Sequence, residues 1–238
     1  MRLILLFCSV LLVFALGCNR SGQQSTNNSA GSANVSNGLN ADRSQAKELV
    51  EKGKQLYRDD HDTEAVAALE QAVKLDPELA EAHFRLALGY EAVGKGEEAE
   101  AEYKKSVEAY KKHLDANPDD AEAHYNLGQS YANLANYSEA IREYRQATRL
   151  KENDADMYYD LGVAHTKLAQ YDAAAAAFTK SLEIDPEYYR AQDALTEARE
   201  GIKRIRVGKK HQADLLKKQK EEELKKAGLT VPTPTPKG

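Results

Sequence analysis

The feature that most constrains the fold of this chain is a sequence that recurs after 34 residues. The segment AHYNLGQSYANLANYSEAIREYRQA begins at Ala123, and MYYDLGVAHTKLAQYDAAAAAFTKS follows in the same register from Met157. Gly128 of the first segment therefore matches Gly162 of the second. Units that recur at this period form stacked arrays, because one unit cannot bury its apolar face alone. The period predicts a stack of similar units rather than a single globular core.

Two further copies lie upstream, and their residue types favour helices. The copy AHFRLALGYEAVGKGEEAEAEYKKS begins at Ala82, and the earliest copy surrounds Gly53. Alanine and glutamate dominate these segments, and both are good helix formers. Small residues such as Gly128 and Ala140 alternate with large ones such as Tyr144, as two closely crossing helices require. Proline cannot continue a helix, and it closes three of the four copies, at Pro77, Pro118 and Pro186.

This pattern resembles the tetratricopeptide repeat, a helix–turn–helix unit of 34 residues. The resemblance covers residues 46–188 and implies an all-α fold, a right-handed α-solenoid of four repeats with a C-terminal capping helix. The expected repeats are residues 46–79, 80–120, 121–154 and 155–188, followed by a capping helix at 189–206.

The second repeat is seven residues longer than the others. Seven residues make two helical turns, so the extra piece lengthens the second helix without rotating its apolar face. We expect this helix to span residues 97–116 and to protrude past its neighbours. Two interpretations stay open, namely drift in a tolerant array and a ledge for a partner.

The N-terminus has the pattern of an export signal. Arg2 precedes an apolar run from Leu3 to Leu16, which is too short to span a membrane but fits the hydrophobic region of a signal peptide. The run ends at Ala-Leu-Gly-Cys18, which resembles the lipobox of bacterial lipoproteins. The resemblance implies a signal peptide at residues 1–17 and a lipid on Cys18. An uncleaved anchor and an ordinary cleaved signal are the alternatives.

The residues after Cys18 suggest a destination and a spacer. In the lipoprotein sorting rule, Asn19 implies the outer membrane, on the periplasmic side of the cell envelope. Residues 18–45 are rich in Ser, Asn and Gly without an apolar period, so we expect a flexible tether.

The repeats and the C-terminal segment that follows them differ in charge. Residues 44–202 contain 19 Lys and Arg against 33 Asp and Glu, whereas residues 203–238 contain 11 against 4. We expect a charged basic helix at 207–228 and a disordered proline-rich tail at 229–238. This basic end could fold back on the acidic repeats, or contact anionic lipids or an acidic partner.

No motif in the sequence indicates an enzyme, a metal site or a cofactor. The chain lacks the phosphate-binding glycine loop, the His-Glu-x-x-His run and the Gly-x-Ser-x-Gly elbow. Both cysteines, Cys8 and Cys18, lie at the N-terminus. His83 and His124 occupy equivalent positions and are interpreted as packing residues. The acidic repeats disfavour nucleic acid, and nothing indicates a small-molecule substrate.

The resemblance implies a concave groove lined by the first helices of successive repeats. Carried over by alignment, its residues are Lys54, Tyr57, Phe84, Leu88, Tyr125, Gln129, Asn133, Tyr159, Val163 and Lys167. Phe84, Tyr125 and Tyr159 fall in register, and they either form a binding ladder or pack between repeats. The expected ligand is a protein or peptide of mixed apolar and acidic character.

These observations together predict a lipid-anchored envelope scaffold that binds a partner in the groove and is anchored to the membrane through Cys18. The alternatives are a structural spacer without a groove ligand and an accessory subunit of a cell-wall or secretion enzyme.

Overall fold

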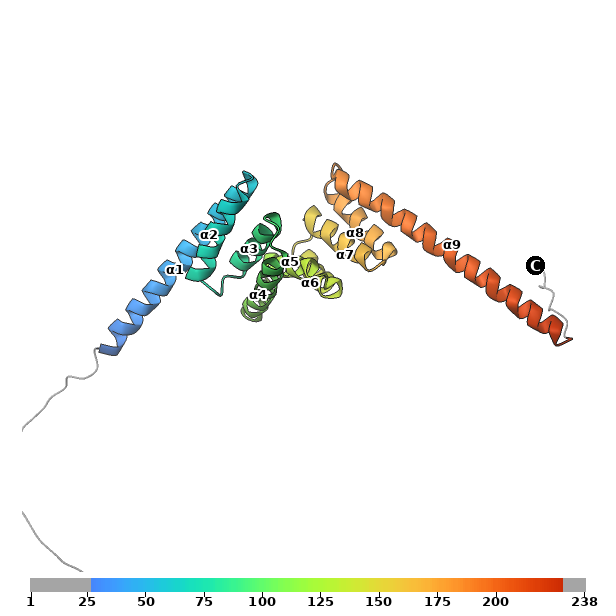
Figure 1. The fold of residues 1–238 in the computed structure, drawn as a ribbon, viewed down its shortest axis with the longest axis horizontal. Helices are drawn as coiled ribbons and strands as arrows, with labels where there is room; N and C mark the ends of the chain where they lie inside the picture. The colour runs from blue at the N-terminus through green and yellow to red at the C-terminus, as the bar shows by residue number, and fades with distance from the viewer. Residues whose placement is uncertain (1–26, 229–238) are drawn as a thin grey trace, which may run out of the picture. The chain divides into compact units, whose positions relative to one another are not determined.

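The computed structural model describes residues 27–228, with side-chain burial from residue 40 onward. Two units divide the chain, Met1–Ala41 and Asp42–Gly238. The described part of the first unit is helical, and the second unit contains the repeats (Figure 1). Within residues 27–228 every regular element is a helix, so the all-α prediction is confirmed. The helices are α1 (Asn27–Arg58), α2 (Asp62–Leu75), α3 (Ala80–Ala92), α4 (Gly96–Ala116), α5 (Ala121–Asn133), α6 (Tyr137–Leu150), α7 (Ala155–Lys167), α8 (Tyr171–Ile184) and α9 (Tyr189–Lys226).

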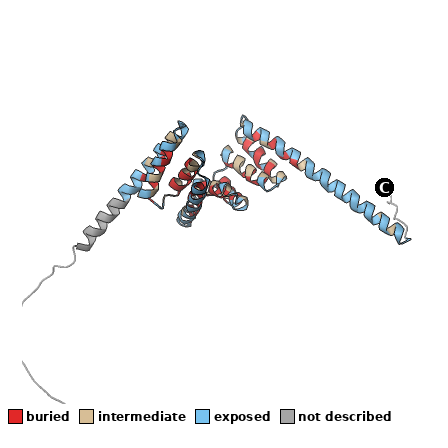
Figure 2. Ribbon diagram, in the orientation of Figure 1, coloured by how far each residue is buried: buried red, intermediate tan, exposed pale blue. Residues whose placement is uncertain are grey.

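In the second unit, helices that are consecutive in the sequence pack against one another. From α2 to α9, each helix contacts the next, and α3 also touches α5 while α7 touches α9. Buried residues gather where consecutive helices meet, and most of α9 beyond its first turns is exposed (Figure 2). This is the arrangement of a helical solenoid, in which each unit covers the open apolar face of its neighbour.

The two helices of each repeat cross at small residues. A Cβ atom at Gly128 would lie 2.6 Å from Cδ1 of Tyr144, and one at Gly162 would lie 2.5 Å from Cε1 of Phe178. Both distances are too short for a real contact, so an aromatic ring of the second helix occupies the space that a side chain would need. The predicted alternation of small and large residues is confirmed at this crossing.

The turn inside each repeat uses one residue with positive φ. Asp60, Gly94, Ala135 and Ala169 have φ values of 60°, 76°, 57° and 54°. The amide of the following residue donates to the carbonyl oxygen five residues earlier, for example from Asn136 to Tyr131 at 2.9 Å. This is the Schellman ending, which satisfies carbonyl groups left open at the end of the first helix.

One face of the two extra turns in the second repeat is buried, while the other residues on these turns are exposed. Tyr110 and Leu114, on the two extra turns, belong to the apolar cluster that also contains Phe84 and Leu127. The expectation that these turns protrude past their neighbours is therefore wrong for this apolar face. Since Tyr110 lies seven residues after Tyr103, it continues the same buried stripe of α4.

Two predicted boundaries differ from the structure. The sequence predicts a flexible tether through residues 27–45, but these residues belong to α1. Ala46 and Val50, in the turns of α1 that follow residue 45, are buried. Extending a helix from turns that are already formed costs less free energy than starting a new helix. The predicted capping helix and basic helix are one helix, α9, which continues through Gly201 and Gly208 without a break.

Several predictions concern segments outside the described residues. The signal peptide at 1–17, Cys18 and the tail at 229–238 all lie there. Within residues 27–228, no helix combines the length and the apolar character that crossing a membrane requires.

Candidate functional site: a groove across the first helices

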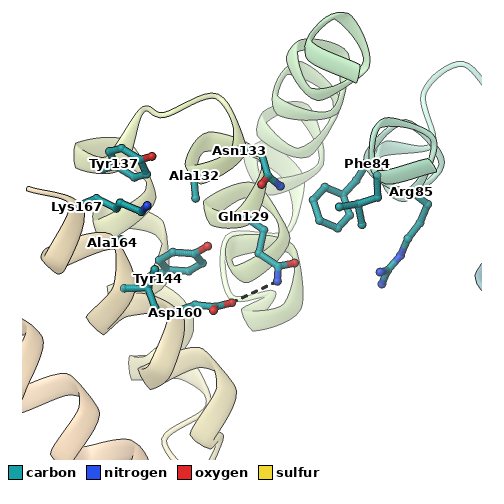
Figure 3. Close-up of a pocket in the computed structure, with 12 residues that line it drawn as sticks. Phe84, Arg85, Gln129, Ala132, Asn133, Tyr137, Tyr144, Asp160, Ala164 and Lys167 are labelled. Atoms are coloured by element: carbon teal, nitrogen blue, oxygen red, sulfur yellow. Dashed lines mark hydrogen bonds between the residues drawn. The ribbon is translucent and has the colours of Figure 1, made fainter. Parts of the chain in front are cut away.

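A hollow of about 560 Å³ lies across the first helices of three successive repeats. It is lined by α3, α5 and α7 together with two residues of α6. In Figure 3, Phe84 and Arg85 lie on one side of it, Tyr137 and Lys167 lie on the other, and Gln129 lies between them. The lining residues are Phe84, Arg85, Leu88, Gln129, Ala132, Asn133, Tyr137, Tyr144, Asp160, Val163, Ala164 and Lys167.

The groove exists because the same helical positions recur in each repeat. Leu88, Gln129 and Val163 occupy equivalent places on α3, α5 and α7. Residues three or four positions away share their helix face, which brings Arg85 and Asn133 to the same surface. Successive first helices therefore present one continuous surface, lined by apolar residues such as Leu88 and by polar ones such as Gln129 and Asn133.

The acidic group in the groove already has protein partners. The Tyr125 hydroxyl donates to Oδ2 of Asp160 at 2.7 Å, and Gln129 Nε2 lies 3.4 Å from the same oxygen. Burial raises the pKa of the Asp160 carboxyl, although these two hydrogen bonds act in the opposite direction. The carboxyl thus joins α5 to α7 at the base of the groove and is not a free charge.

A second, smaller hollow of about 190 Å³ lies at the first two repeats and shares Arg85 and Leu88 with the groove. Its other lining residues are Lys54, Tyr57 and Arg58. Three of its five residues are cationic, although the repeats as a whole carry a net negative charge.

The cations of this smaller hollow are only partly neutralised by protein groups. Lys54 Nζ bonds Glu51 at 2.8 Å and Glu81 at 3.3 Å. Arg85 Nε is buried and makes no hydrogen bond to any described residue, and its nearest carboxylate oxygen, on Glu81, is 3.5 Å away. Glu51 and Glu81 together balance Lys54 and Arg85, whereas the third cation, Arg58, bonds the amide oxygen of Gln55 and pairs with no carboxylate of the described residues.

Family models match the repeats that form this groove. Two described as "Tetratricopeptide repeat" span residues 78–153 and 127–189, and one described as "TPR repeat" spans residues 53–94. Together they run from 53 to 189, which is more than half of the 238 residues. The chain is a tetratricopeptide-repeat (TPR) protein. No curated protein sequence matches it.

Solved structures share the TPR fold with this chain. PilF of Pseudomonas aeruginosa is 21% identical with a TM-score of 0.51, and the match covers 67% of this chain and 72% of PilF. A MamA structure from AMB-1 is 21% identical with a TM-score of 0.50, covering 75% and 98%. A further MamA structure is 25% identical with a TM-score of 0.49, covering 79% and 98%. These likenesses concern the fold.

The structure brings together eight of the ten groove residues predicted from the TPR resemblance. Six line the larger hollow, and Lys54 and Tyr57 line the smaller one with Leu88. Tyr125 and Tyr159 line neither hollow. The six in the larger hollow are Phe84, Leu88, Gln129, Asn133, Val163 and Lys167.

The predicted aromatic ladder is a set of packing pairs inside the TPR units. Phe84, Tyr125 and Tyr159 each pack against a ring of the second helix, with centroids 6.0, 5.7 and 5.7 Å apart. Tyr159 also contacts the ring of Tyr188 at 5.2 Å. These contacts favour packing as the role of Tyr125 and Tyr159, whereas Phe84 both packs against a ring and lines the groove.

Sequence reasoning missed Arg85 and Asp160. They occupy the same position of two TPR units, with Asn126 between them in the third repeat. This position lies one turn before Leu88 and Val163, which were recognised, so the helical period contained the signal. Among the described residues, no group of His, Cys, Asp and Glu is arranged to hold a metal ion.

Proposed function

We propose that this TPR protein is an envelope scaffold that binds a peptide segment of a protein partner in the groove. TPR arrays are protein–protein interaction scaffolds, and such scaffolds are typically non-enzymatic. The observation that carries the proposal is the continuous hollow across three first helices, lined by apolar residues such as Leu88 and Val163 and by many polar ones. A hollow of this kind suits a peptide side chain rather than a flat protein surface.

The charges of the two hollows define the chemistry of the peptide. Asp160 is already hydrogen bonded within the protein, whereas Arg85 has a buried Nε–H group without a hydrogen bond to the described residues. An acidic group of the ligand would pair with the exposed part of the Arg85 guanidinium beside Lys54, and an apolar side chain would cover Leu88. The proposed ligand is therefore a segment with an acidic residue next to an apolar one.

The first test replaces Arg85 and Leu88, which line both hollows. Partners are captured with the full-length protein from detergent-solubilised membranes, and each is then titrated against purified variants. We expect Arg85→Glu and Leu88→Glu each to weaken binding by at least about tenfold, since each places a charge against the ligand. Circular dichroism establishes that the variants fold.

The matched control is Arg149→Glu on α6, which lines neither hollow and is exposed. It has the same change of charge as Arg85→Glu, and we expect it to bind as wild type does. Equal binding by all three variants would contradict the groove proposal. It would favour a spacer without a groove ligand, or an accessory subunit that uses another surface.

The membrane anchor is a separate part of the proposal. It is supported by the apolar run from Leu3 to Leu16 followed by Gly17 and Cys18, and by the resemblance of this sequence to a lipobox. A chain with two or more acyl groups would stay on the membrane stably, and Asn19 favours the outer one. The scaffold would then concentrate its partner at the envelope.

Labelling with radioactive palmitate in a bacterial host tests this anchor. We expect wild type to incorporate label and to fractionate with membranes, and Cys18→Ser to lose the label. Cys8→Ser is the matched control and should keep it. An unlabelled wild-type chain that stays with the membrane would indicate an uncleaved anchor, and a released one would indicate an ordinary cleaved signal.

A further inference from the structure

The C-terminal half of α9 is a helix that the repeats leave uncovered (Figure 2). Ala191, Leu195 and Ala198, in the first three turns of α9, are buried, whereas every residue from 203 to 220 is exposed. Because α9 continues without a break to Lys226, its basic end does not fold back on the acidic repeats. Residues 203–226, the α9 extension, make a helix of about 36 Å whose surface is open to a partner.

The α9 extension combines unpaired cations with exposed apolar side chains. It contains ten Lys and Arg against four Asp and Glu. Among the described residues, only Lys203 of these ten forms an ion pair, with Glu200 at 2.5 Å. The extension also contains four of the eight large apolar side chains that are exposed in the described part of the chain, namely Ile205, Val207, Leu215 and Leu216.

Apolar and cationic side chains share one face of this helix. Ile205 and Leu216 are eleven residues apart, which is close to three helical turns, so they lie on the same side. Lys209 and Lys220 each follow one of them by four residues and therefore lie on that side too. Two further cations extend the face, which we call the basic–apolar face and which consists of Ile205, Arg206, Lys209, Leu216, Lys217 and Lys220.

The acidic residues of the extension lie mostly on its other side. At 3.6 residues per turn, Asp214, Glu221 and Glu222 are about 100° or more from the middle of the basic–apolar face, and Glu223 lies at its margin. The face begins at a hollow of about 530 Å³, where α9 passes the turn between α7 and α8. This hollow is lined by Ile205, Arg206 and Lys209, and Asp172 is the one acidic residue in it.

We propose that the basic–apolar face of α9 binds an anionic lipid surface and lies along it. Clusters of Lys and Arg on an exposed helix are attracted to anionic headgroups, and apolar side chains beside them enter the boundary with the acyl chains. Within residues 27–228 no helix is suited to cross a membrane, so the contact is with the surface. The proposal depends neither on a peptide in the groove nor on a lipid at Cys18.

The mixing of charge and apolar surface favours a lipid over a protein helix as the occupant. A partner helix requires an apolar seam that repeats every three or four residues. Lys209 interrupts such a seam between Ile205 and Leu216, and Lys220 interrupts it again after Leu216. A lipid surface accepts these interruptions, because a lysine lays its apolar stem along the boundary and extends its charge to the headgroups.

The first experiment uses tryptophan fluorescence of the full chain, which contains no tryptophan of its own. Leu216→Trp places the probe on the basic–apolar face, and His211→Trp places it on the opposite side, about 180° from the middle of that face. Each variant is mixed with vesicles of phosphatidylcholine alone, or of phosphatidylcholine and phosphatidylglycerol in equal parts. We expect a shift to shorter wavelength only for Leu216→Trp with phosphatidylglycerol, and added salt should reduce it. No shift at position 216, or an equal shift at both positions, would overturn the proposal.

The second experiment removes charge from one side of the helix at a time, in the Leu216→Trp chain. Lys209→Gln with Lys220→Gln removes two cations from the basic–apolar face, and Arg204→Gln with Lys218→Gln removes two from the opposite side. We expect the first pair to raise the lipid concentration at half of the fluorescence change by at least about tenfold, and the control pair by much less. Since all chains have the same N-terminus, its contribution cancels. Equal effects of the two pairs would contradict a specific face.

Other occupants of this face would give different results. A chain that binds poly-glutamate but shows no fluorescence shift with phosphatidylglycerol vesicles would overturn the proposal in favour of an acidic protein. Dimers in sedimentation equilibrium that Leu216→Lys abolishes, again without a shift on vesicles, would overturn it in favour of a second copy of this chain. None of these results affects the groove test, because Arg85 and Leu88 lie on α3.

Discussion

At the scale of single residues, the turns inside the repeats store avoidable strain. Ala135 and Ala169 have φ values of 57° and 54°, and Asp60 has 60°. An L-residue with a side chain pays a steric penalty in this region, of about 1–2 kcal/mol, whereas glycine does not. Only the second repeat has a glycine there, Gly94, at φ 76°.

Replacing either alanine by glycine should stabilise the protein. We expect Ala135→Gly and Ala169→Gly each to raise the free energy of unfolding by about 1 kcal/mol, because relief of strain exceeds the added freedom of the unfolded chain. Urea denaturation at neutral pH measures it. The control is Ala101→Gly on the exposed face of α4, which should lower that free energy by about 1 kcal/mol. A loss of stability with Ala135→Gly would contradict the strain argument.

These turn residues show how far residue-level prediction reaches. The recurrence of Gly128 at Gly162 predicts a helix crossing at this place, and the structure confirms it. Positive φ at Ala135 and Ala169 was not predicted, because alanine itself gives no signal of a left-handed turn. Only their alignment with Gly94 contained that information.

At the scale of elements, α4 is the longest of the second helices of the repeats, and it contains a buried polar group that has no hydrogen-bond partner among the described residues. The Tyr110 hydroxyl of α4 is buried, and it makes no hydrogen bond to a described residue although Asn126 and Arg85 lie near it. Tyr103, one heptad earlier on the same stripe, donates to Glu91 at 2.8 Å. The two tyrosines thus offer a matched comparison of a satisfied hydroxyl and an unsatisfied one.

Removing the two hydroxyls should have opposite effects. We expect Tyr110→Phe to raise the free energy of unfolding by about 1 kcal/mol, since it removes a buried group without a protein partner. Tyr103→Phe should lower it by about 1–2 kcal/mol, because Glu91 loses a donor. Urea denaturation of both variants checks the pair. Equal losses in both would show that the Tyr110 hydroxyl is satisfied.

At the scale of the whole repeat unit, periodicity made the groove predictable in outline. Eight of the ten residues predicted from the register of the repeats line the hollows, because equivalent positions of stacked helices share a surface. It did not identify the role of Tyr125 and Tyr159, since an aromatic residue at a helix face suits packing and binding equally. Sequence pattern also failed where it had no period, in residues 27–45 of α1.

The pattern of contacts between successive helices has a consequence for the order of folding. A large apolar cluster spans α3 to α8, while two smaller clusters lie at the start and the end of the array. Most contacts join segments near in sequence, so little loop entropy is lost before packing is gained, and such chains fold quickly. The largest cluster offers the most apolar burial to a first nucleus. The centre of the array should therefore form first and the terminal helices last, so the chain assembles outward in both directions.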